Sequence, residues 1–376
     1  CDGEATPPAD PDAHPLEAYV LAARAPEQDG GRSGLQLYLQ GADLLGSAHL
    51  QYPDNLLLAT YAITRENVAD NVIYSEVRCE TTGYTRAGMS AIDATEMLRH
   101  GFNLASLFLA GQPARGGKRR WPLVRTNILL AAKRHKEEEE ARKVVALLES
   151  YLERRPGDVE RSLSRLRFPQ PFPPWWRPSD VVGFDLSGDE SKDKEWLAAV
   201  IKPLTTRSSP ITIHAGEASD AQSIWRAVYG LNATRIGHGL RLAEDQALLG
   251  YCVREGICME MCPNSNAATN GFRCIPALDR SPYPLLQYEY PLLQYMRAGM
   301  EVTLGTDNRY LHPPNRRDLT SEYVAAARLV GGLTRWEVLQ IVKAGFKNAF
   351  LEKVEISEML GAIEEKVYGI VAADAP

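Results

Sequence analysis

The sequence contains no long apolar run, and this absence excludes several classes of protein. None of its 376 residues belongs to an uninterrupted hydrophobic stretch near the roughly 20 residues that a membrane-spanning helix needs. It also lacks the basic, apolar and small-residue pattern of a secretory signal peptide. The net charge is −6 and no sustained basic face is visible, so duplex nucleic acid is not an expected partner.

Paired cysteine spacing is absent as well. The six cysteines form no CxxC motif, and several stand in apolar runs with the composition of strands. Reduced thiols are therefore expected, which favours a cytoplasmic protein. Position 1 is Cys rather than Met, so we expect the natural chain to begin upstream of it.

What the sequence does contain is a regular alternation of strands and helices. With 44% hydrophobic and 24% charged residues, it has the composition of a globular protein with a sizeable core. Helical patterns include 91–110, 137–153 and a tail over about 335–367. Seven apolar runs predict strands, at 72–79, 124–131, 181–186, 211–214, 235–238, 257–262 and 301–305. Near-continuous apolar strands in this alternation are typical of a parallel sheet that is buried on both faces.

Seven parallel strands fit either a doubly wound sheet or a barrel. No glycine-rich phosphate fingerprint follows any strand, although a dinucleotide-binding sheet needs one. Polar residues of ligand type instead follow nearly all of the later strands, as at the C-terminal end of α/β barrels. The sequence therefore predicts one α/β domain over residues 1–376, a TIM-like (β/α)8 barrel with extra helices. Since a closed barrel of this type has eight strands, we expect the first strand to lie upstream of residue 1.

The stretch Ile211–Glu217 organises the candidate site, because a β-branched strand ends there in His214 and is followed closely by Glu217. His214 and Asp307 are nitrogen and oxygen donors at the ends of separate strands, which suits zinc or a related metal. Such a metal lowers the pKa of a bound water towards neutrality and yields hydroxide. The hydroxide needs an orienting group, for which His238 is placed, and the leaving group needs a proton carrier, for which Glu217 is placed.

Each of these residues also has a purely structural interpretation. A strand end with a buried, hydrogen-bonded His214 and a solvated Glu217 accounts equally well for that stretch alone. Asp307, within Gly-Thr-Asp-Asn, fits the N-cap of a helix. Only the order of the residues and their shared position at strand ends favour a catalytic arrangement. Glu76 and Arg78, in the first predicted strand, are interpreted as an ion pair or a network at the barrel end.

As a set, five motifs resemble the successive motifs of the adenosine deaminase family, which belongs to the metal-dependent amidohydrolase barrels. They are VVGFDLSGDE at 181–190, IHAGE at 213–217, RIGHGLRL at 235–242, EMCPNSN at 260–266 and LGTDN at 304–308. In addition, YSEVR at 74–78 resembles the second strand of the family. The resemblance implies a hydrolase with one Zn²⁺ per chain. It would replace the 6-amino group of adenosine or an adenine nucleotide with oxygen and release ammonia.

Carried over by position, the resemblance implies a role for four polar residues. His214 and Asp307 would be zinc ligands, and Asp307 would also belong to the catalytic set. His238 would orient the hydroxide, and Glu217 would move a proton to the purine ring. His312 matches no motif of the family and is interpreted as a surface or packing residue. Because it follows Asp307 by five positions, a role in supporting the metal site is the alternative.

Three further positions match substrate contacts of the family. The backbone of Gly188 would contact the base, and Asp2 would contact a hydroxyl of the sugar. Asn308 stands where many members have a second aspartate that contacts the purine. Because asparagine keeps a hydrogen-bonding group and loses the charge, this departure concerns the fit of the substrate and not the chemistry.

The larger departure lies at the front of the chain. Members of the family carry a His-x-His pair, with two more zinc ligands, before a Leu-Asp-Gly, and no such pair occurs here. Since the chain opens on Cys1-Asp2-Gly3, we expect the pair and its strand to precede it. The alternative is that both ligands were lost. The protein would then be a catalytically inactive nucleoside-binding or assembly scaffold.

The motifs predict the type of reaction more firmly than the substrate. Free adenosine or deoxyadenosine is the default of the family, whereas a phosphorylated substrate needs cations near the sugar. The candidates are Arg86, Arg115, Lys118, Arg119, Arg120, Arg125 and Arg309. The CRISPR-associated type of the family, in which a ligand-sensing regulatory domain precedes the barrel and ATP becomes ITP in antiviral defence, is the alternative. In either case the expected partner is a small-molecule adenine nucleoside or nucleotide, and a homo-oligomer is expected.

Overall fold

The computed structural model has a parallel sheet at its centre. It describes residues 39, 49–110, 123–153, 172–173, 175–269, 271–272, 274–275, 287–312 and 318–373. Seven strands form the sheet in the order β1-β2-β3-β4-β5-β6-β9, and all neighbours are parallel. The strands are β1 (Tyr74–Cys79), β2 (Arg125–Lys133), β3 (Val181–Ser187), β4 (Ile211–Ala215), β5 (Arg235–His238), β6 (Cys258–Met261) and β9 (Val302–Leu304). Each of them falls on one of the seven predicted apolar runs, so the strand prediction is confirmed.

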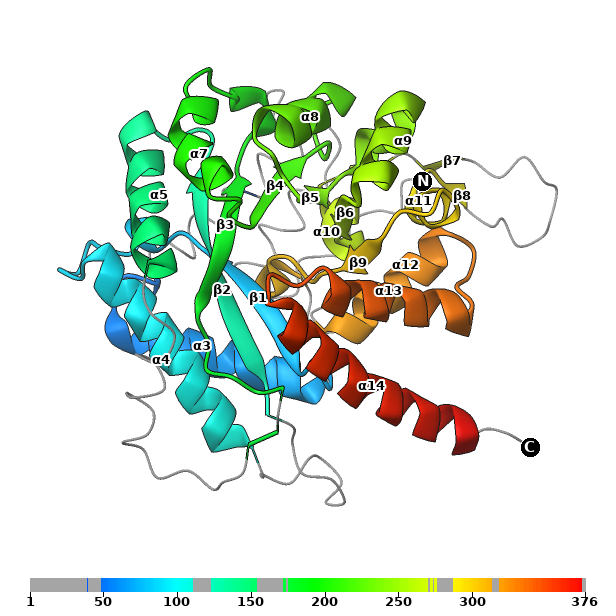
Figure 1. The fold of residues 1–376 in the computed structure, drawn as a ribbon, viewed down its shortest axis with the longest axis horizontal. Coiled ribbons are helices and arrows are strands. Elements are labelled where there is room, and N and C mark those ends of the chain that lie inside the picture. Colours follow the sequence, from blue (N-terminus) through cyan, green and yellow to red (C-terminus); the bar gives the residue numbers. More distant parts are fainter. Residues whose placement is uncertain are drawn as a thin grey trace, which may run out of the picture.

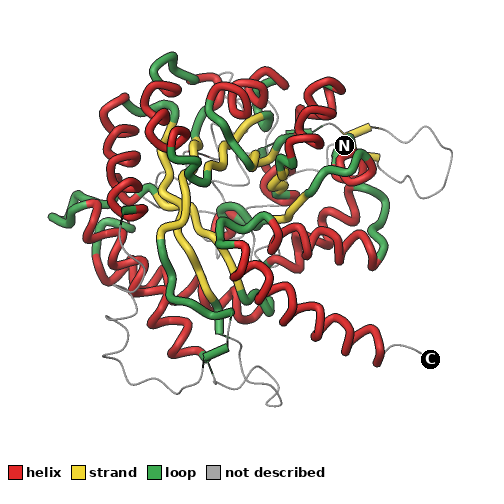
Figure 2. Tube along the Cα trace, in the orientation of Figure 1, coloured by secondary structure: helices red, strands yellow, loops and turns green. Residues whose placement is uncertain are grey.

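Helices surround the strands (Figures 1 and 2). The described helices are α3 (Pro53–Ala69), α4 (Ala91–Leu109), α5 (Glu138–Leu152), α7 (Leu197–Thr206), α8 (Ala221–Trp225), α9 (Gln246–Glu255), α10 (Pro263–Ala268), α11 (Leu292–Arg297), α12 (Leu319–Leu329), α13 (Arg335–Lys347) and α14 (Lys353–Ala373). The predicted helical tail is therefore two helices, and the second projects away from the sheet (Figure 1). A short antiparallel pair joins β7 (Cys274–Ile275) to β8 (Gln287–Tyr288). Among the described helices, none has the length and apolar character needed to cross a membrane.

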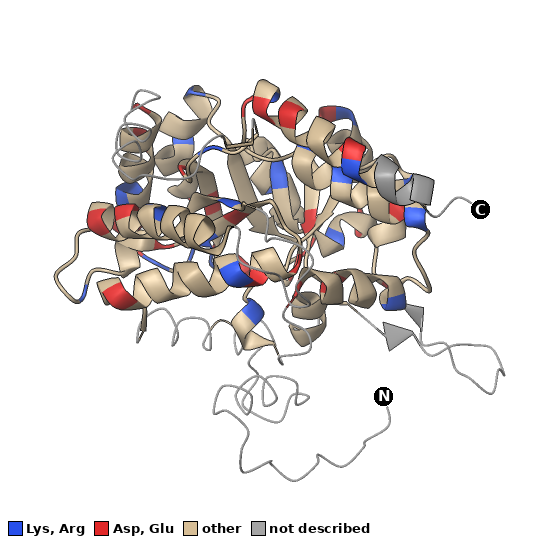
Figure 3. Cartoon of the chain, turned by 90° about the horizontal axis from the view of Figure 1, so that it is seen from below, with Lys and Arg blue, Asp and Glu red and all other residues tan. Residues whose placement is uncertain are grey.

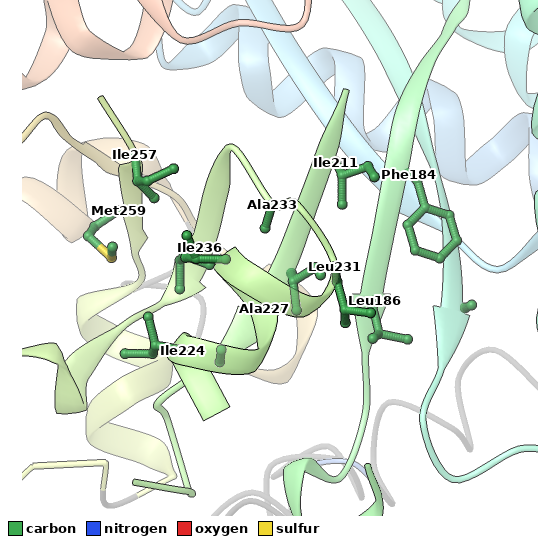
Figure 4. Close-up of a cluster of buried hydrophobic side chains, with 14 of the residues drawn as sticks. Phe184, Leu186, Ile211, Ile224, Ala227, Leu231, Ala233, Ile236, Ile257 and Met259 are labelled. Atoms are coloured by element: carbon green, nitrogen blue, oxygen red, sulfur yellow. The ribbon is translucent and has the colours of Figure 1, made fainter. Parts of the chain in front are cut away.

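A large hydrophobic core fills the space between the strands and the helices. The inner strands are largely buried on both faces, and in β2 every residue but the last is buried, whereas β1 and β9 at the ends of the sheet are mostly half-buried. Figure 4 shows part of the core, in which Phe184, Leu186, Ile211 and Ile236 of the strands and Ile224 of α8 belong to one cluster. This burial explains why the strands read as continuous apolar runs rather than as alternating ones.

Charged side chains of four strands form a network inside the sheet. Arg235 of β5 pairs with Glu76 of β1 at 2.5 Å and with Glu260 of β6 at 3.0 Å. Arg78 of β1 pairs with Glu260 and lies 3.5 Å from Asp185 of β3. Because β1 and β6 are far apart in the strand order, these contacts require the sheet to curl as a barrel does. The prediction that Glu76 and Arg78 belong to an ion-pair network is confirmed, and Figure 3 shows charged positions on the central strands.

A cavity of about 780 Å³ lies between β1 and β9, the two strands at the ends of the strand order. All six residues of β1 line it, together with residues of β9, α3 and α13. Within the described ranges, no strand pairs with the outer edge of either end strand. The described sheet is thus a curled, seven-stranded part of an α/β barrel, and the strand expected upstream of residue 1 stays a prediction.

Substitution of Arg235 tests whether the buried ion pairs stabilise the curled sheet. Replacing Arg235 by Met leaves Glu76 and Glu260 without this partner in the interior, so the free energy of unfolding should fall by about 3–5 kcal/mol. Replacing Lys347, which pairs with Glu301 on the surface, should change it by less than about 1 kcal/mol. Urea unfolding of R235M and K347M measures both values. Equal losses in the two variants would contradict a structural role for the network.

Candidate active site

The C-terminal ends of β4, β5 and β9 bring four of the predicted site residues together. His214 lies in β4 and His238 ends β5, and their ring centroids are 5.1 Å apart. Glu217 follows β4, and its Oε2 lies 3.4 Å from Nε2 of His238. Asp307 follows β9 closely enough for both histidines to act on its charge. Four groups that are up to 93 positions apart in the chain therefore share one site, as the sequence predicted.

Two of these side chains are presented from unusual backbone. His238 has φ of 65° and Asp307 has φ of 48°, both in the left-handed region that residues other than glycine seldom adopt. At His238 the left-handed turn ends the strand abruptly and is continued by Gly239 with φ of 62°. Such conformations cost free energy and are concentrated at functional sites, where the surrounding structure enforces them.

His214 is oriented by a buried carboxylate. Its Nδ1 lies 3.0 Å from Oδ1 of Asp185, a fully buried residue of β3, and Arg134 donates to the His214 carbonyl at 2.6 Å. Burial opposes the charge of Asp185, but His214 and Arg78 hold its pKa below the ordinary value. With Nδ1 donating to this carboxylate, the Nε2 atom of His214 remains free to act as a ligand.

Asp307 presents a carboxylate to the cavity between β1 and β9. Ser265 of α10 donates to its Oδ2 at 2.6 Å, and Asp307 is part of the cavity lining. Asp307 is exposed towards the cavity. The partial desolvation of its carboxylate would raise the pKa of Asp307, but His238, the Ser265 hydrogen bond and His214 lower it. An ionised oxygen donor and an imidazole nitrogen donor are thus present together, and this pair of ligand types suits zinc.

The two donors are half of a tetrahedral ligand set. In the part of the chain that the structure describes, no three His, Cys, Asp or Glu side chains come together in a way that could hold a metal. His312 is buried in the turn after Asp307 and helps to lower the pKa of that carboxyl. His312 is therefore close enough to Asp307 to act on its charge, and a role in supporting the metal site stays a prediction.

Glu217 is buried and firmly held. Its Oε1 accepts a hydrogen bond from Thr269 at 2.8 Å. Its backbone, with that of Gly216, donates to the carboxylate of Glu190 at 3.0 and 3.1 Å. Burial raises the pKa of Glu217, although the charge of His238 opposes the change. A carboxyl group whose affinity for a proton is raised in this way is suited to general acid–base catalysis.

The predicted substrate contacts have different outcomes. Gly188, directly after β3, has φ of 93°, and a Cβ there would lie 2.9 Å from Nδ1 of His135, so the position requires glycine. Asn308 is exposed and lines the cavity, at the start of a 3-10 turn. Asp2 lies outside the described residues and stays a prediction.

The predicted cations are less available than the sequence suggested. Arg125 pairs with Glu355 at 2.7 Å, and Arg309 pairs with Glu66 at 3.1 Å. The cluster Arg115, Lys118, Arg119 and Arg120 lies outside the described residues. Arg86 is described, and its backbone amide donates to Gln51.

Several residues that support the site had no role in the sequence analysis. Asp185, Glu190, Ser265 and Asn266 stand inside the quoted motifs, and a carboxylate within the apolar run 181–186 was a usable signal. Glu322 of α12 had no such signal. It accepts hydrogen bonds from the backbone and the side chain of Asn264, both at 3.0 Å, and thereby anchors α10. Burial raises the pKa of Glu322 to about 7.

Comparison with known proteins agrees with this geometry. The family model described as adenosine deaminase matches residues 169–366, more than half of the chain. An adenosine deaminase of Enterococcus faecalis is 27% identical over 307 residues, which cover 81% of this chain and 75% of that protein. An aminodeoxyfutalosine deaminase of Streptomyces coelicolor is 34% identical over 180 residues, which cover 47% and 42%. The chain thus spans less than half the length of this second relative.

Solved structures show the same fold. An amidohydrolase from Burkholderia ambifaria with bound Zn has a TM-score of 0.65 at 18% identity, over 89% of this chain and 80% of that one. Arabidopsis ADAL in complex with IMP has a TM-score of 0.66 at 19% identity, over 93% and 86%. The curled sheet described above therefore has the α/β-barrel fold of these proteins.

Glu322 predicts a pH dependence of stability. Its pKa is about 7 in the folded chain and near 4.5 when unfolded, so between these values the folded state binds more protons. Stability should therefore fall as pH rises through this window, by about 3 kcal/mol in total from this group. Urea unfolding at several pH values should show a smaller fall for E322Q. The exposed variant E255Q is the control, and an unchanged slope in E322Q would contradict the assignment.

Proposed function

Since the chain belongs to the adenosine deaminase family, we propose that it hydrolyses the 6-amino group of an adenine nucleoside, giving the inosine product and ammonia. It is a metal-dependent hydrolase of the amidohydrolase superfamily. The observation that carries the proposal is the meeting of His214, Glu217, His238 and Asp307 at the C-terminal ends of three strands. α/β barrels place their catalytic groups at this end.

The metal that we propose is zinc, one ion per chain, held by His214 and Asp307. The residues fit it, because Asp185 occupies Nδ1 of His214 and leaves the other ring nitrogen, and the lowered pKa of Asp307 keeps its carboxylate ionised as an oxygen donor. The zinc in the Burkholderia ambifaria structure supports this choice. The remaining ligands would come from outside the described residues. When bound, the ion would lower the pKa of a water molecule towards neutrality.

The residues of the chain would divide the remaining tasks. Glu217, whose pKa is raised by burial, would carry a proton to a nitrogen of the purine ring. His238, 3.4 Å from Glu217, would orient the attacking oxygen. The backbone of Gly188 would contact the base, and Asn308 at the cavity would face the purine. One water is consumed, and its oxygen replaces the amino group that leaves as ammonia.

A nucleoside is the substrate that we favour over a nucleotide. Arg125 and Arg309, two of the cations predicted to face a phosphate, form ion pairs with Glu355 and Glu66. The solved relatives with bound IMP or GMP keep AMP as the second candidate. Conversion of ATP to ITP by a CRISPR-associated type rests on the basic cluster at 115–120. That alternative, a regulatory domain, a homo-oligomer and a cytoplasmic location stay predictions from the sequence.

Two substitutions separate proton transfer from metal binding. Glu217→Gln should keep zinc but lower kcat by roughly 10²–10⁴-fold, because a proton carrier is lost. His214→Ala should lose zinc and activity together, because it removes a ligand. Zinc content by emission spectrometry and deamination rates measure both effects. The exposed His100→Ala is the control, and an E217Q rate equal to that of the parent would exclude Glu217 from the mechanism.

The substrate is tested with adenosine, AMP and ATP offered separately to the zinc-loaded full-length protein. We expect inosine from adenosine at the highest kcat/KM, with slower turnover of AMP. A preference for ATP would favour the CRISPR-associated alternative. A full-length protein that holds zinc and deaminates none of the three contradicts the proposal. A full-length protein without zinc and without activity supports the scaffold alternative.

A further inference from the structure

One buried amide touches both Glu217, the proposed proton carrier, and His238, the group proposed to orient the attacking oxygen. Asn266 of α10 is fully buried. Its Nδ2 lies 2.9 Å from Nδ1 of His238 and 3.5 Å from Oε1 of Glu217. The reaction as described above gives Asn266 no task, although no other side chain that we describe bonds to both residues. Its position calls for an explanation beyond packing.

The orientation of the Asn266 amide is determined by a partner that can only donate. The backbone N–H of Cys262 lies 3.3 Å from Oδ1 of Asn266. A backbone N–H has no acceptor capacity, so the side-chain atom that faces it must be the oxygen. The hydroxyl of Tyr290 donates to the same oxygen at 3.2 Å. With the oxygen fixed on that side, the NH₂ group faces His238.

This orientation determines which nitrogen of His238 carries the proton. An NH₂ group only donates, so Nδ1 of His238 must accept and must be unprotonated. The proton of the neutral ring is then on Nε2, the nitrogen that lies 3.4 Å from Oε2 of Glu217. In this tautomer the ring can donate at Nε2 and cannot take up a proton there.

We infer that Asn266 is a positioning residue that fixes the Nε2–H tautomer of His238 and points the single ring proton towards Glu217 and the substrate. His238 thus orients the attacking oxygen by donating a hydrogen bond and does not act as the base. The second hydrogen of the Asn266 amide is directed at Glu217, so one side chain sets the relative position of both groups. The inference relies on the proposed function only for the statement that these two residues act on substrate.

Direct observation of the ring nitrogens tests the inference without any activity measurement. Protein labelled with ¹⁵N-histidine is examined at about pH 8, above the ordinary histidine pKa of about 6.5, by NMR of the couplings between ring nitrogens and carbon-bound protons. The signals of His238 are assigned from their loss in H238Q. We expect Nε2 to be protonated and Nδ1 unprotonated in the parent protein. Protonation of Nδ1 there would overturn the inference.

Two substitutions then show whether Asn266 is the cause. Asn266→Asp keeps the shape but presents an acceptor, so Nδ1 of His238 should become protonated. Asn266→Ala removes the donor without adding charge, so both tautomers should be populated. Asn103→Asp changes another buried asparagine, which accepts from Ser179, and should leave the His238 signals unchanged. Far-ultraviolet circular dichroism confirms that each variant is folded.

The kinetic outcome follows from the tautomer. N266D should lower kcat roughly 10²-fold with little change in KM, because binding survives while the donor at Nε2 is misdirected. N266A should lose less than N266D. A normal His238 tautomer in both variants would overturn the inference whatever the rates. Inactivity of the parent protein with the expected tautomer would instead contradict the proposed function alone.

Discussion

The structure depends on charges that are buried inside the curled sheet and neutralised there by one another. Glu76, Arg235, Glu260 and Arg78 alternate in sign, and each carboxylate meets a guanidinium of a different strand. Burial of such groups without partners would cost several kcal/mol each, so the strands must curl far enough to pair them. The chain of contacts continues from Arg78 to Asp185 and from Asp185 to His214. The curvature of the sheet and the orientation of His214, a proposed metal ligand, therefore depend on one connected set of contacts.

A second set of contacts, made by α10, supports the site residues at the strand ends. The short helix α10 supplies Ser265 to Asp307 and Asn266 to His238, and Glu322 anchors the helix through Asn264. These bonds explain how His238 and Asp307 persist in left-handed backbone, because strained conformations survive only where the surroundings enforce them. The strands bring the reacting groups together, and the hydrogen bonds from α10 fix the side-chain conformations of His238 and Asp307 and, by our inference, the tautomer of His238.

Most of the architecture follows from local sequence, whereas the support of the site does not. Apolar runs bounded by polar residues located all seven strands, because burial on both faces leaves a clear compositional signal. His214, Glu217, His238 and Asp307 were found because they stand at strand ends. Glu76 and Arg235 are 159 positions apart in the chain, and Asn264 and Glu322 are 58 positions apart. No local sequence pattern predicts pairs at such distances. The break between α13 and α14 was missed for a related reason, since both segments have helical periodicity.

The described hydrogen bonds hold the proposed reacting groups more firmly than Asn308, the proposed substrate contact. Glu217, His238 and Asp307 are held by hydrogen bonds to α10 and its neighbour Thr269, so a change in any of them disturbs the others. Asn308 makes no side-chain capping bond and is exposed at the cavity between β1 and β9. A residue without such hydrogen bonds can be substituted without moving the reacting groups. Under the proposed function, an asparagine in place of aspartate at position 308 is therefore compatible with an intact reaction.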